Sequence, residues 1–274
     1  MSDNAADTSL FAARVESLDR EVNQLRARVQ QIENEQTEYL QNVSHQLVAP
    51  LNAIKWHIEN LTQGRLSVDR AKKVLRSVYS QATLAVHLAK NFNLMSNLEG
   101  EHALKALKEP LQEVNLFRLL VNLADDFQPL AWDRNIQISV NKTNFETAPT
   151  VLAMRPLISQ VFSNIIENAV KYSNSDTEIV VRGRPGPNST VVVEVLNQGI
   201  PLHATQAQAI FDRGFRSVEA QRRYPAGTGF GLYIARRIIE VHEGKISAFN
   251  ELSWVVVQVA LSIKGLEGKT RFRA

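Results

Sequence analysis

The sequence contains no cysteine, which excludes a disulfide framework, cysteine-ligated metal centres and thiol catalysis. It also lacks any run of about 18 consecutive apolar residues, so we predict no membrane-spanning helix in this chain. The first residues, MSDNAADTSL, are polar and acidic, unlike a secretory signal peptide. Together these absences favour a cytoplasmic protein.

A strong excess of charge is absent as well. The net charge is only +3, from 31 Lys and Arg against 28 Asp and Glu, and we therefore expect no nucleic-acid partner. A hydrophobic content of 44% and a charged content of 22% are ordinary for soluble globular proteins. With 274 residues, the chain is long enough for one large or two ordinary domains.

A helical repeat fills the first part of the chain. We expect residues 1–9 to lack regular structure and residues 10–62 to form one long helix. Its apolar residues recur in alternating steps of four and three, which predicts a coiled coil. After Val43 two successive steps of four, around Pro50, break the heptad and predict local unwinding and a kink. The repeat consists of Phe11, Val15, Leu18, Val22, Leu25, Val29, Ile32, Tyr39 and Val43, with Gln36 as its one polar member between Ile32 and Tyr39.

His45 lies between Val43 and Leu47 and so faces away from the apolar stripe. An imidazole that projects outward beside a weak point in a helix could act as a nucleophile. The alternative is an ordinary solvated surface histidine, one of the six in the chain.

A second helix is predicted from Val68 to about Leu98, with Ser67 as its N-cap. Its apolar stripe again advances in steps of four and three. Two such helices joined by a short turn form a hairpin, and one hairpin cannot bury both of its apolar faces. We therefore expect a homodimer in which two hairpins build a four-helix bundle.

From Val114 onward strands and helices alternate. This pattern predicts an α/β sandwich with a mixed sheet covered by helices on one face. The predicted helices are 116–132, 155–172 and 231–242, and the predicted strands are 136–140, 150–153, 178–182, 190–196, 245–250 and 254–263.

The helix 155–172 carries Asn164, Asn168 and Lys171 on one stripe. Carboxamide oxygens and an ammonium could hold a hydrated Mg²⁺ and phosphate oxygens, because hard cations take oxygen ligands. The alternative is an amphipathic helix with a solvated face.

Two glycine-containing turns could approach a ligand closely. Asn197-Gln198-Gly199 follows the strand VVVEVL, and the Asn197 side chain could accept a hydrogen bond from an adenine amino group. The segment 227–232, GTGFGL, leads into a helix, where backbone N–H groups can cradle phosphates. A dinucleotide-binding turn fits less well, because the preceding RSVEAQRRYPA is no strand. That segment instead predicts a mobile lid.

These pieces together resemble a bacterial sensor histidine kinase over roughly residues 39–263. VSHQLVAPLNAI is similar to the family's phosphoacceptor box, NIIENAVKYS to its Asn box and LNQGIP to its first glycine box. IFDRGFRS is similar to its Phe box, and GTGFGLYIARRIIEVHEGKI to its second glycine box. The order of the boxes, with the phosphoacceptor hairpin before the ATP-binding domain, also fits.

The resemblance implies roles for individual residues. His45 would receive the γ-phosphoryl group of ATP, with Gln46 beside it in the catalytic centre. Asn168, helped by Asn164, would hold Mg²⁺. The remaining ATP-binding residues would be Lys171 and Tyr172 on the phosphate side, Asn197 and Gly199 at the adenine, Arg213 or Arg216 near the lid to neutralise phosphoryl charge, and Gly227, Thr228, Gly229, Gly231 and Leu232 around the phosphates.

Three residues depart from the family pattern. Gln46 replaces the usual Glu or Asp after the histidine and cannot ionise. Ala49 stands where the family often has a Thr or Asn that orients water for dephosphorylation. Asn197 replaces the Asp that usually begins the first glycine box, and that box is shorter than usual.

The resemblance also implies a domain order. Residues 1–38 would be a disordered start and coiled-coil signalling helix, 39–99 the dimerisation and histidine-phosphotransfer hairpin, and 100–113 a linker. Residues 114–264 would be the catalytic ATP-binding domain, and 265–274 a tail.

The function implied is an ATP-dependent autokinase that passes phosphate from His45 to an aspartate in the receiver domain of a response regulator. Gln46 and Ala49 leave open a catalytically weak dimeric scaffold that regulates a partner by binding. A third alternative, another ATPase of the same fold, does not account for the hairpin with its outward histidine.

Overall fold

The computed structural model describes residues 3–63, 67–98, 110–145, 150–225 and 227–263. The chain forms two compact units, Met1–His45 and Gln46–Ala274, which are described separately below. Part of the predicted linker 100–113 and the whole tail 265–274 lie outside the described residues.

Helix α1 spans Asp3–Gln63 and passes through Pro50 without interruption, so it belongs to both units. The prediction that residues 1–9 lack regular structure is wrong for residues 3–9, which are helical. In the first unit Leu18, Val22, Leu25 and Val29 are exposed. A coiled-coil partner would cover such a stripe, and this partner stays a prediction.

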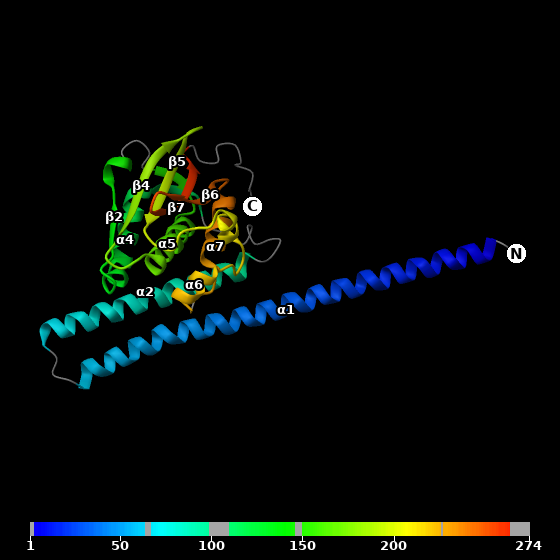
Figure 1. Cartoon of the computed structure of the whole chain (residues 1–274), viewed down its shortest axis with the longest axis horizontal. Helices are drawn as coiled ribbons and strands as arrows, with labels where there is room; N and C mark the ends of the chain where they lie inside the picture. The colour runs from blue at the N-terminus through cyan, green and yellow to red at the C-terminus, as the bar shows by residue number, and fades with distance from the viewer. Residues whose placement is uncertain (1–2, 64–66, 99–109, 146–149, 226, 264–274) are drawn as a thin grey trace. The chain divides into compact units, whose positions relative to one another are not determined.

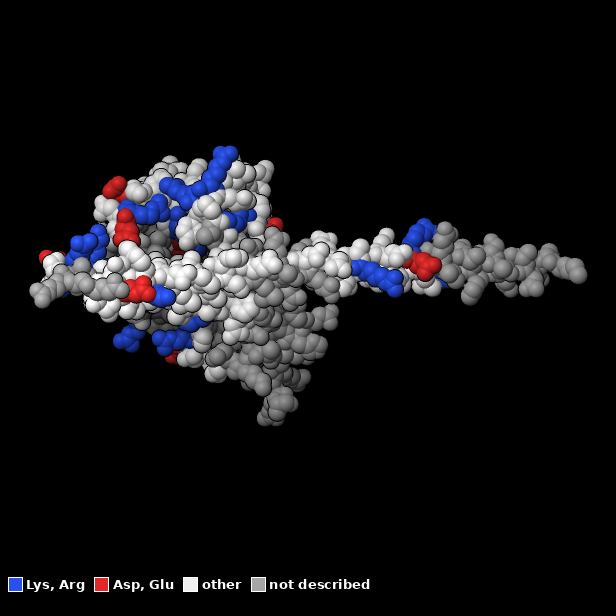
Figure 2. Space-filling model, turned by 90° about the horizontal axis from the view of Figure 1, so that it is seen from below, with Lys and Arg blue, Asp and Glu red and all other residues white. Residues whose placement is uncertain are grey.

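Helix α2 spans Val68–Leu98 and confirms the predicted second helix. The Ser67 side chain accepts a hydrogen bond from the Arg70 N–H at 3.4 Å, as expected of an N-cap. Figure 2 shows that the visible face of the hairpin carries few charged side chains. Large apolar side chains are exposed on the hairpin, among them Val48, Leu51, Trp56, Ile58, Leu75, Tyr79 and Val86.

The rest of the second unit is an α/β domain (Figure 1). Its main sheet has the order β2-β4-β5-β7-β6, and a separate two-stranded sheet pairs β1 with β3. β2 and β4 are parallel and the other neighbours are antiparallel, which confirms a mixed sheet. The strands are β1 (Gln112–Asn115), β2 (Gln137–Val140), β3 (Thr150–Ala153), β4 (Glu178–Gly186), β5 (Thr190–Asn197), β6 (Lys245–Glu251) and β7 (Trp254–Ser262); the helices are α4 (Leu116–Trp132), α5 (Arg155–Tyr172), α6 (Val218–Arg223) and α7 (Gly231–Val241), with short 3₁₀ turns η1 (Lys142–Phe145), η2 (Ala204–Gln206) and η3 (Ala209–Phe211).

Helices α4, α5 and α7 cover one face of the main sheet (Figure 1). Side chains alternate between the faces of a strand, so Val193 and Val195 of β5 point toward these helices. Both residues are buried, as are Phe162 and Ile165 of α5 and Ile238 of α7. This shared apolar layer is the core that fixes α5 and α7 against the sheet.

The opposite face of the sheet carries charge. Glu194 of β5 is only 2% exposed, yet it belongs to this face. Arg182 Nε donates to Glu194 Oε2 at 2.6 Å, and Arg184 NH2 to Glu194 Oε1 at 3.2 Å. The arginine stems therefore cover the sheet while their guanidinium groups satisfy the buried carboxylate.

Candidate functional site

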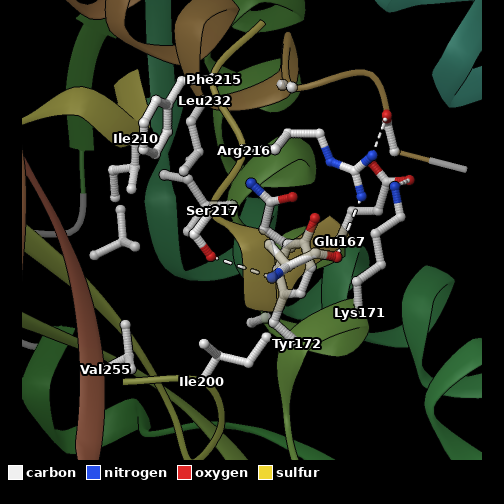
Figure 3. A pocket seen from close by; sticks show the side chains of 18 of the residues that line it. Glu167, Lys171, Tyr172, Ile200, Ile210, Phe215, Arg216, Ser217, Leu232 and Val255 are labelled. Carbon is white, nitrogen blue, oxygen red and sulfur yellow. Dashed lines mark hydrogen bonds and ion pairs between the residues drawn. The ribbon is translucent and has the colours of Figure 1, made fainter. Parts of the chain in front are cut away.

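An open pocket lies between the main sheet, α5, α7 and the segment that joins β5 to α7, and Leu88 and Asn91 of α2 also line it. Figure 3 shows apolar side chains along one part of its wall and the charged groups of Glu167, Lys171 and Arg216 along another. The apolar part is built by Ile200, Ile210, Phe215, Leu232 and Val255. A pocket with this division suits a ligand that joins a flat apolar body to an anionic group.

The polar residues predicted to share one stripe of α5 do not all reach the pocket. Asn168, Lys171 and Tyr172 line the pocket. Asn164 does not line it and is completely buried. Of the two carboxamides predicted to reach the metal, the structure therefore brings only Asn168 to the pocket.

Glu167 and Lys171 form an ion pair one turn apart on α5, with Nζ and Oε1 separated by 2.7 Å. Burial by itself would raise the pKa of the Glu167 carboxyl, but Lys171 and His87 outweigh it and hold that pKa well below its usual range. Burial would likewise lower the pKa of Lys171, but the Glu167 carboxylate raises it. Both groups are therefore charged at neutral pH.

The turn after β5 is tied to the C-terminal end of α5. Ser173 and Gly199 form a β-bridge, and the Asn174 N–H donates to the Gln198 carbonyl at 2.7 Å. A Cβ added at Gly199 would lie 2.1 Å from the Tyr172 carbonyl oxygen, so only glycine allows this approach. The predicted adenine residue Asn197 is buried and lines the pocket, while Gly199 serves the packing of the turn.

The predicted lid contains the short helix α6. Ser217 caps it by accepting a hydrogen bond from the Ala220 N–H at 3.1 Å. Tyr224, just after α6, places its ring 4.9 Å from Lys171 Nζ. Arg223 NH1 donates to the Tyr172 carbonyl at 3.2 Å. The lid thus lies against the end of α5.

Arg216 holds the lid together. NH1 donates to the carbonyls of Pro225 at 3.0 Å and Gly227 at 2.8 Å. NH2 donates to the carbonyls of Ala220 at 3.2 Å and of Tyr224. Arg216 also lines the pocket, whereas Arg213 does not; the guanidinium of Arg213 lies 5.9 Å from the centre of the Phe230 ring. Neutralisation of phosphoryl charge by either arginine stays a prediction.

Replacing Arg216 with lysine should open the lid in the absence of nucleotide. An ammonium keeps the charge but cannot bridge four carbonyls, and each hydrogen bond from a charged donor contributes about 1.5–3 kcal/mol. We expect trypsin to cut after Arg222 or Arg223 at least ~10-fold faster in Arg216→Lys. Arg118→Lys, an exposed change in α4, is the matched control. Equal cleavage rates in the two variants would contradict the role of Arg216 in the lid.

The glycine-rich segment lies at the pocket with the geometry that backbone approach requires. Gly227, Gly229 and Gly231 all line it, together with Thr228 and Leu232. Gly229 has φ of +75°, and a Cβ there would lie 2.6 Å from the Gly214 carbonyl carbon. Helix α7 begins at Gly231, so its N-terminal N–H groups border the pocket.

His45 and Gln46 lie on α1, at the division between the two units. His45 is exposed and Gln46 is half-buried. The exposure of His45 is what a phosphoacceptor needs.

Several residues that line the site or hold its helices in place were not identified from the sequence. Glu167 could have been found, because it precedes Lys171 by one helical turn, the spacing of a helical ion pair. Arg134 NH1 donates to the carbonyls of Val170 at 2.8 Å and Lys171 at 3.1 Å, closing the end of α5. His242 accepts the Met154 N–H at 3.1 Å; burial lowers the pKa of its imidazole. No local pattern indicates these last two contacts, because they join distant segments.

Among the described residues no helix is sufficiently long and apolar to span a membrane. In the same ranges no group of three or more His, Asp or Glu side chains could hold a metal ion. A bound Mg²⁺ would therefore depend on amide oxygen and on the phosphates of its ligand, which is compatible with the reluctance of Mg²⁺ to lose its waters.

Residues 154–273 match the family described as histidine kinase-, DNA gyrase B- and HSP90-like ATPases. The sensor protein kinase WalK of Staphylococcus aureus is 28% identical over 223 residues, which are 80% of this chain and 51% of that protein. Against WalK of Staphylococcus aureus strain JH9 the same 28% identity covers 35% of the relative. The chain thus spans about half or less of the length of these relatives.

Two solved structures share the fold. Full-length ShkA in complex with AMPPNP is 20% identical, with a TM-score of 0.55, over 83% of this chain and 46% of that chain. Histidine kinase ThkA in complex with the response regulator TrrA is 22% identical, with a TM-score of 0.50, over 83% of this chain and 61% of that chain. Both resemblances include helical residues before the α/β domain.

Proposed function

We propose that this chain, which carries an ATPase domain of that family and is homologous to sensor histidine kinases, is an ATP-dependent protein histidine autokinase. It would phosphorylate His45 and pass the phosphoryl group to an aspartate of a response-regulator receiver domain. The observation that carries the proposal is the pocket, in which Asn168, Lys171 and the glycine-rich segment face the same space as an apolar wall.

ATP fits the two parts of the pocket. Adenine would lie among Ile200, Leu202 and Val255, with Asn197 accepting from its amino group. The phosphates would lie near Lys171 and the backbone N–H groups at the start of α7, where positive charge and the helix dipole favour anions. Mg²⁺, held by Asn168 and phosphate oxygens, would neutralise charge during transfer.

The transfer uses a ring nitrogen of His45 as nucleophile. Its lone pair forms a bond to the γ-phosphorus while the bond to the bridging oxygen breaks, and ADP leaves with that electron pair. The imidazole loses its N–H proton at or after this step. The phosphohistidine then gives the phosphoryl group to a carboxylate oxygen of the receiver aspartate.

Labelling with ATP that carries the label on the γ-phosphate tests the proposal. We expect the full chain, with Mg²⁺, to incorporate label that acid removes and base does not, as for a phosphoramidate. His45→Gln should abolish incorporation. His57→Gln, a second histidine on α1, should retain it. Label that survives acid, or that persists in His45→Gln, would overturn the assignment.

The second candidate is a dimeric scaffold that binds nucleotide and regulates a partner without catalysis. Gln46 and Ala49 favour it, since neither can supply the base or the water-orienting group usual in the family. ATP binding with no label on His45 would select this alternative. In both cases the exposed apolar side chains of the hairpin would form a homodimer interface.

Gln46→Glu should accelerate autophosphorylation. A carboxylate next to His45 could accept the imidazole proton, whereas an amide can only fix the tautomer. General base catalysis is worth roughly 10²- to 10⁴-fold, so we expect a gain toward the lower end of that range. The initial rate of His45 labelling is the measurement, with Gln24→Glu, an exposed change on α1 several turns away from His45, as the control. No gain would show that proton removal does not limit the rate.

A further inference from the structure

A group of polar side chains is buried where α2 contacts α5. His87 of α2 is 4% exposed, and Gln160, Asn164 and Glu167 of α5 are 4%, 0% and 4% exposed. Asn91 of α2 joins them as a half-buried residue. We call these residues the α2–α5 polar cluster. It lies beside the nucleotide pocket proposed above, because Asn91 and Glu167 also line that pocket.

The hydrogen bonds of the cluster fix its atoms. His87 Nε2 lies 2.9 Å from Glu167 Oε2, and Gln160 Nε2 lies 3.0 Å from His87 Nδ1. A neutral imidazole with the proton on Nε2 satisfies both contacts, since it donates to the carboxylate and accepts from the amide. Gln160 Nε2 donates its other proton to Asn91 Oδ1 at 2.9 Å.

Asn91 completes the cluster by donating from Nδ2 to Asn164 Oδ1 at 2.8 Å. Asn164 is the carboxamide that the sequence predicts to assist Mg²⁺, and in this arrangement its oxygen is already used. Its Nδ2 is buried without a hydrogen-bond partner among the described residues. Buried amide groups without a partner are exceptional in folded proteins, and each points to strain, a functional role, or a bound water or ion.

The ammonium group of Lys171 is also occupied by a contact within this region. Its ammonium contacts Glu167 Oε1 at 2.7 Å, while the other oxygen of that carboxylate is held by His87. His87 therefore fixes the orientation of Glu167, and Glu167 fixes Lys171. Asn91 of α2 thus occupies the Asn164 oxygen that a metal would otherwise bind, and His87 orients the carboxylate that pairs with Lys171.

The cluster can separate without leaving a buried charge alone. Glu167 and Lys171 both belong to α5 and stay paired when α2 moves away. The groups that part from α5 are the His87 imidazole and the Asn91 carboxamide, which exchange their hydrogen bonds for water at modest cost. The contact between α2 and α5 is therefore held by directed hydrogen bonds, and the two helices can still separate.

We propose that His87 and Asn91 are positioning residues that withhold Asn164 from Mg-ATP while α2 contacts α5, and that nucleotide loading favours the open state. The proposal rests on the proposed function, because it concerns the same pocket. Linkage makes the two effects reciprocal: a ligand that favours the open state binds more tightly when that state is already favoured.

The absence of cysteine makes the test direct. Lys72 of α2 and Lys245 of β6 are exposed, and each can be changed to cysteine for spin labelling. Pulsed EPR on the full chain, diluted with unlabelled protein, then reports the distance between α2 and the sheet within one chain. We expect one narrow distance without nucleotide, and a second, longer population with Mg²⁺ and a non-hydrolysable ATP analogue.

Variants identify the residues responsible. His87→Ala and Asn91→Ala should show the longer population without nucleotide and bind the Mg²⁺-analogue complex at least ~5-fold more tightly. His87→Gln, which can still donate to Glu167, should lie closer to the unmodified protein. Lys90→Ala, an exposed change on α2, is the control and should alter neither quantity.

The outcomes separate the two proposals. Weaker nucleotide binding in His87→Ala and Asn91→Ala would mean that α2 serves as a wall of the pocket, and would overturn the inference. Unchanged distances in both variants would also overturn it. If the unmodified chain bound no nucleotide, the proposed function would fail, while the nucleotide-free distances would still decide whether His87 and Asn91 hold α2.

Discussion

Glu167→Leu is expected to destabilise the second unit by about 3–5 kcal/mol, because removing one member of a buried ion pair leaves the other charge uncompensated. The Lys171 ammonium would lose its carboxylate, and His87 would lose its acceptor. Urea unfolding followed by circular dichroism measures the change. Glu240→Leu is the control, because Glu240 pairs with Arg236 and Arg237 at the surface and should contribute at most about 1 kcal/mol.

The pH dependence of the same variant gives an independent check. The folded pKa of Glu167 lies below its unfolded value, so its contribution is complete above about pH 4.5 and is lost as the pH falls below that. The unmodified protein should therefore lose more stability than Glu167→Leu on acidification through this range. A destabilisation near zero at neutral pH, or parallel pH profiles, would contradict the buried pair.

Asn168→Asp is expected to weaken binding of Mg-ATP by about 10- to 100-fold, equivalent to about 1.4–2.8 kcal/mol. Asn168 lines the pocket beside Lys171, so a new carboxylate would repel the phosphates or bind the cation too firmly for transfer. Titration with a fluorescent ATP analogue in the presence of Mg²⁺ measures the affinity.

The control for this substitution is Asn188→Asp, which makes the same chemical change in the exposed turn between β4 and β5. It should leave the affinity unchanged. Equal affinities for Asn168→Asp and the unmodified chain would remove Asn168 from the ligand site.

Much of the fold follows from local periodicity. The predicted helices 116–132 and 155–172 are confirmed as α4 and α5, because each has one continuous apolar face and a clear start. β1 was missed, since four residues of mixed character carry no alternating pattern and pair only with the distant β3. β4 runs to Gly186, beyond the predicted 182, because pairing with β5 extends the strand through a proline and two glycines.

The candidate site was predictable where chemistry follows from residue type and spacing. Asn168, Lys171 and the glycine-rich segment were identified in this way, and the structure brings them to one pocket. The burial of Asn164 was not predictable, because it depends on Asn91, which lies far away in the sequence. The contacts of Arg216 were equally hidden, since its acceptors are backbone carbonyls, which no side-chain pattern reveals.

The connection between the end of α5 and the turn at Gly199 has a consequence for nucleotide selectivity and residence time. Backbone hydrogen bonds join these two walls, so the end proposed to bind the base and the neighbouring end proposed to bind phosphate are held together. The lid around α6 is not part of this connection and can still widen the entrance. Bulky substituents on the purine should be rejected whatever the lid does, whereas the rate of ADP release should follow how often the lid opens.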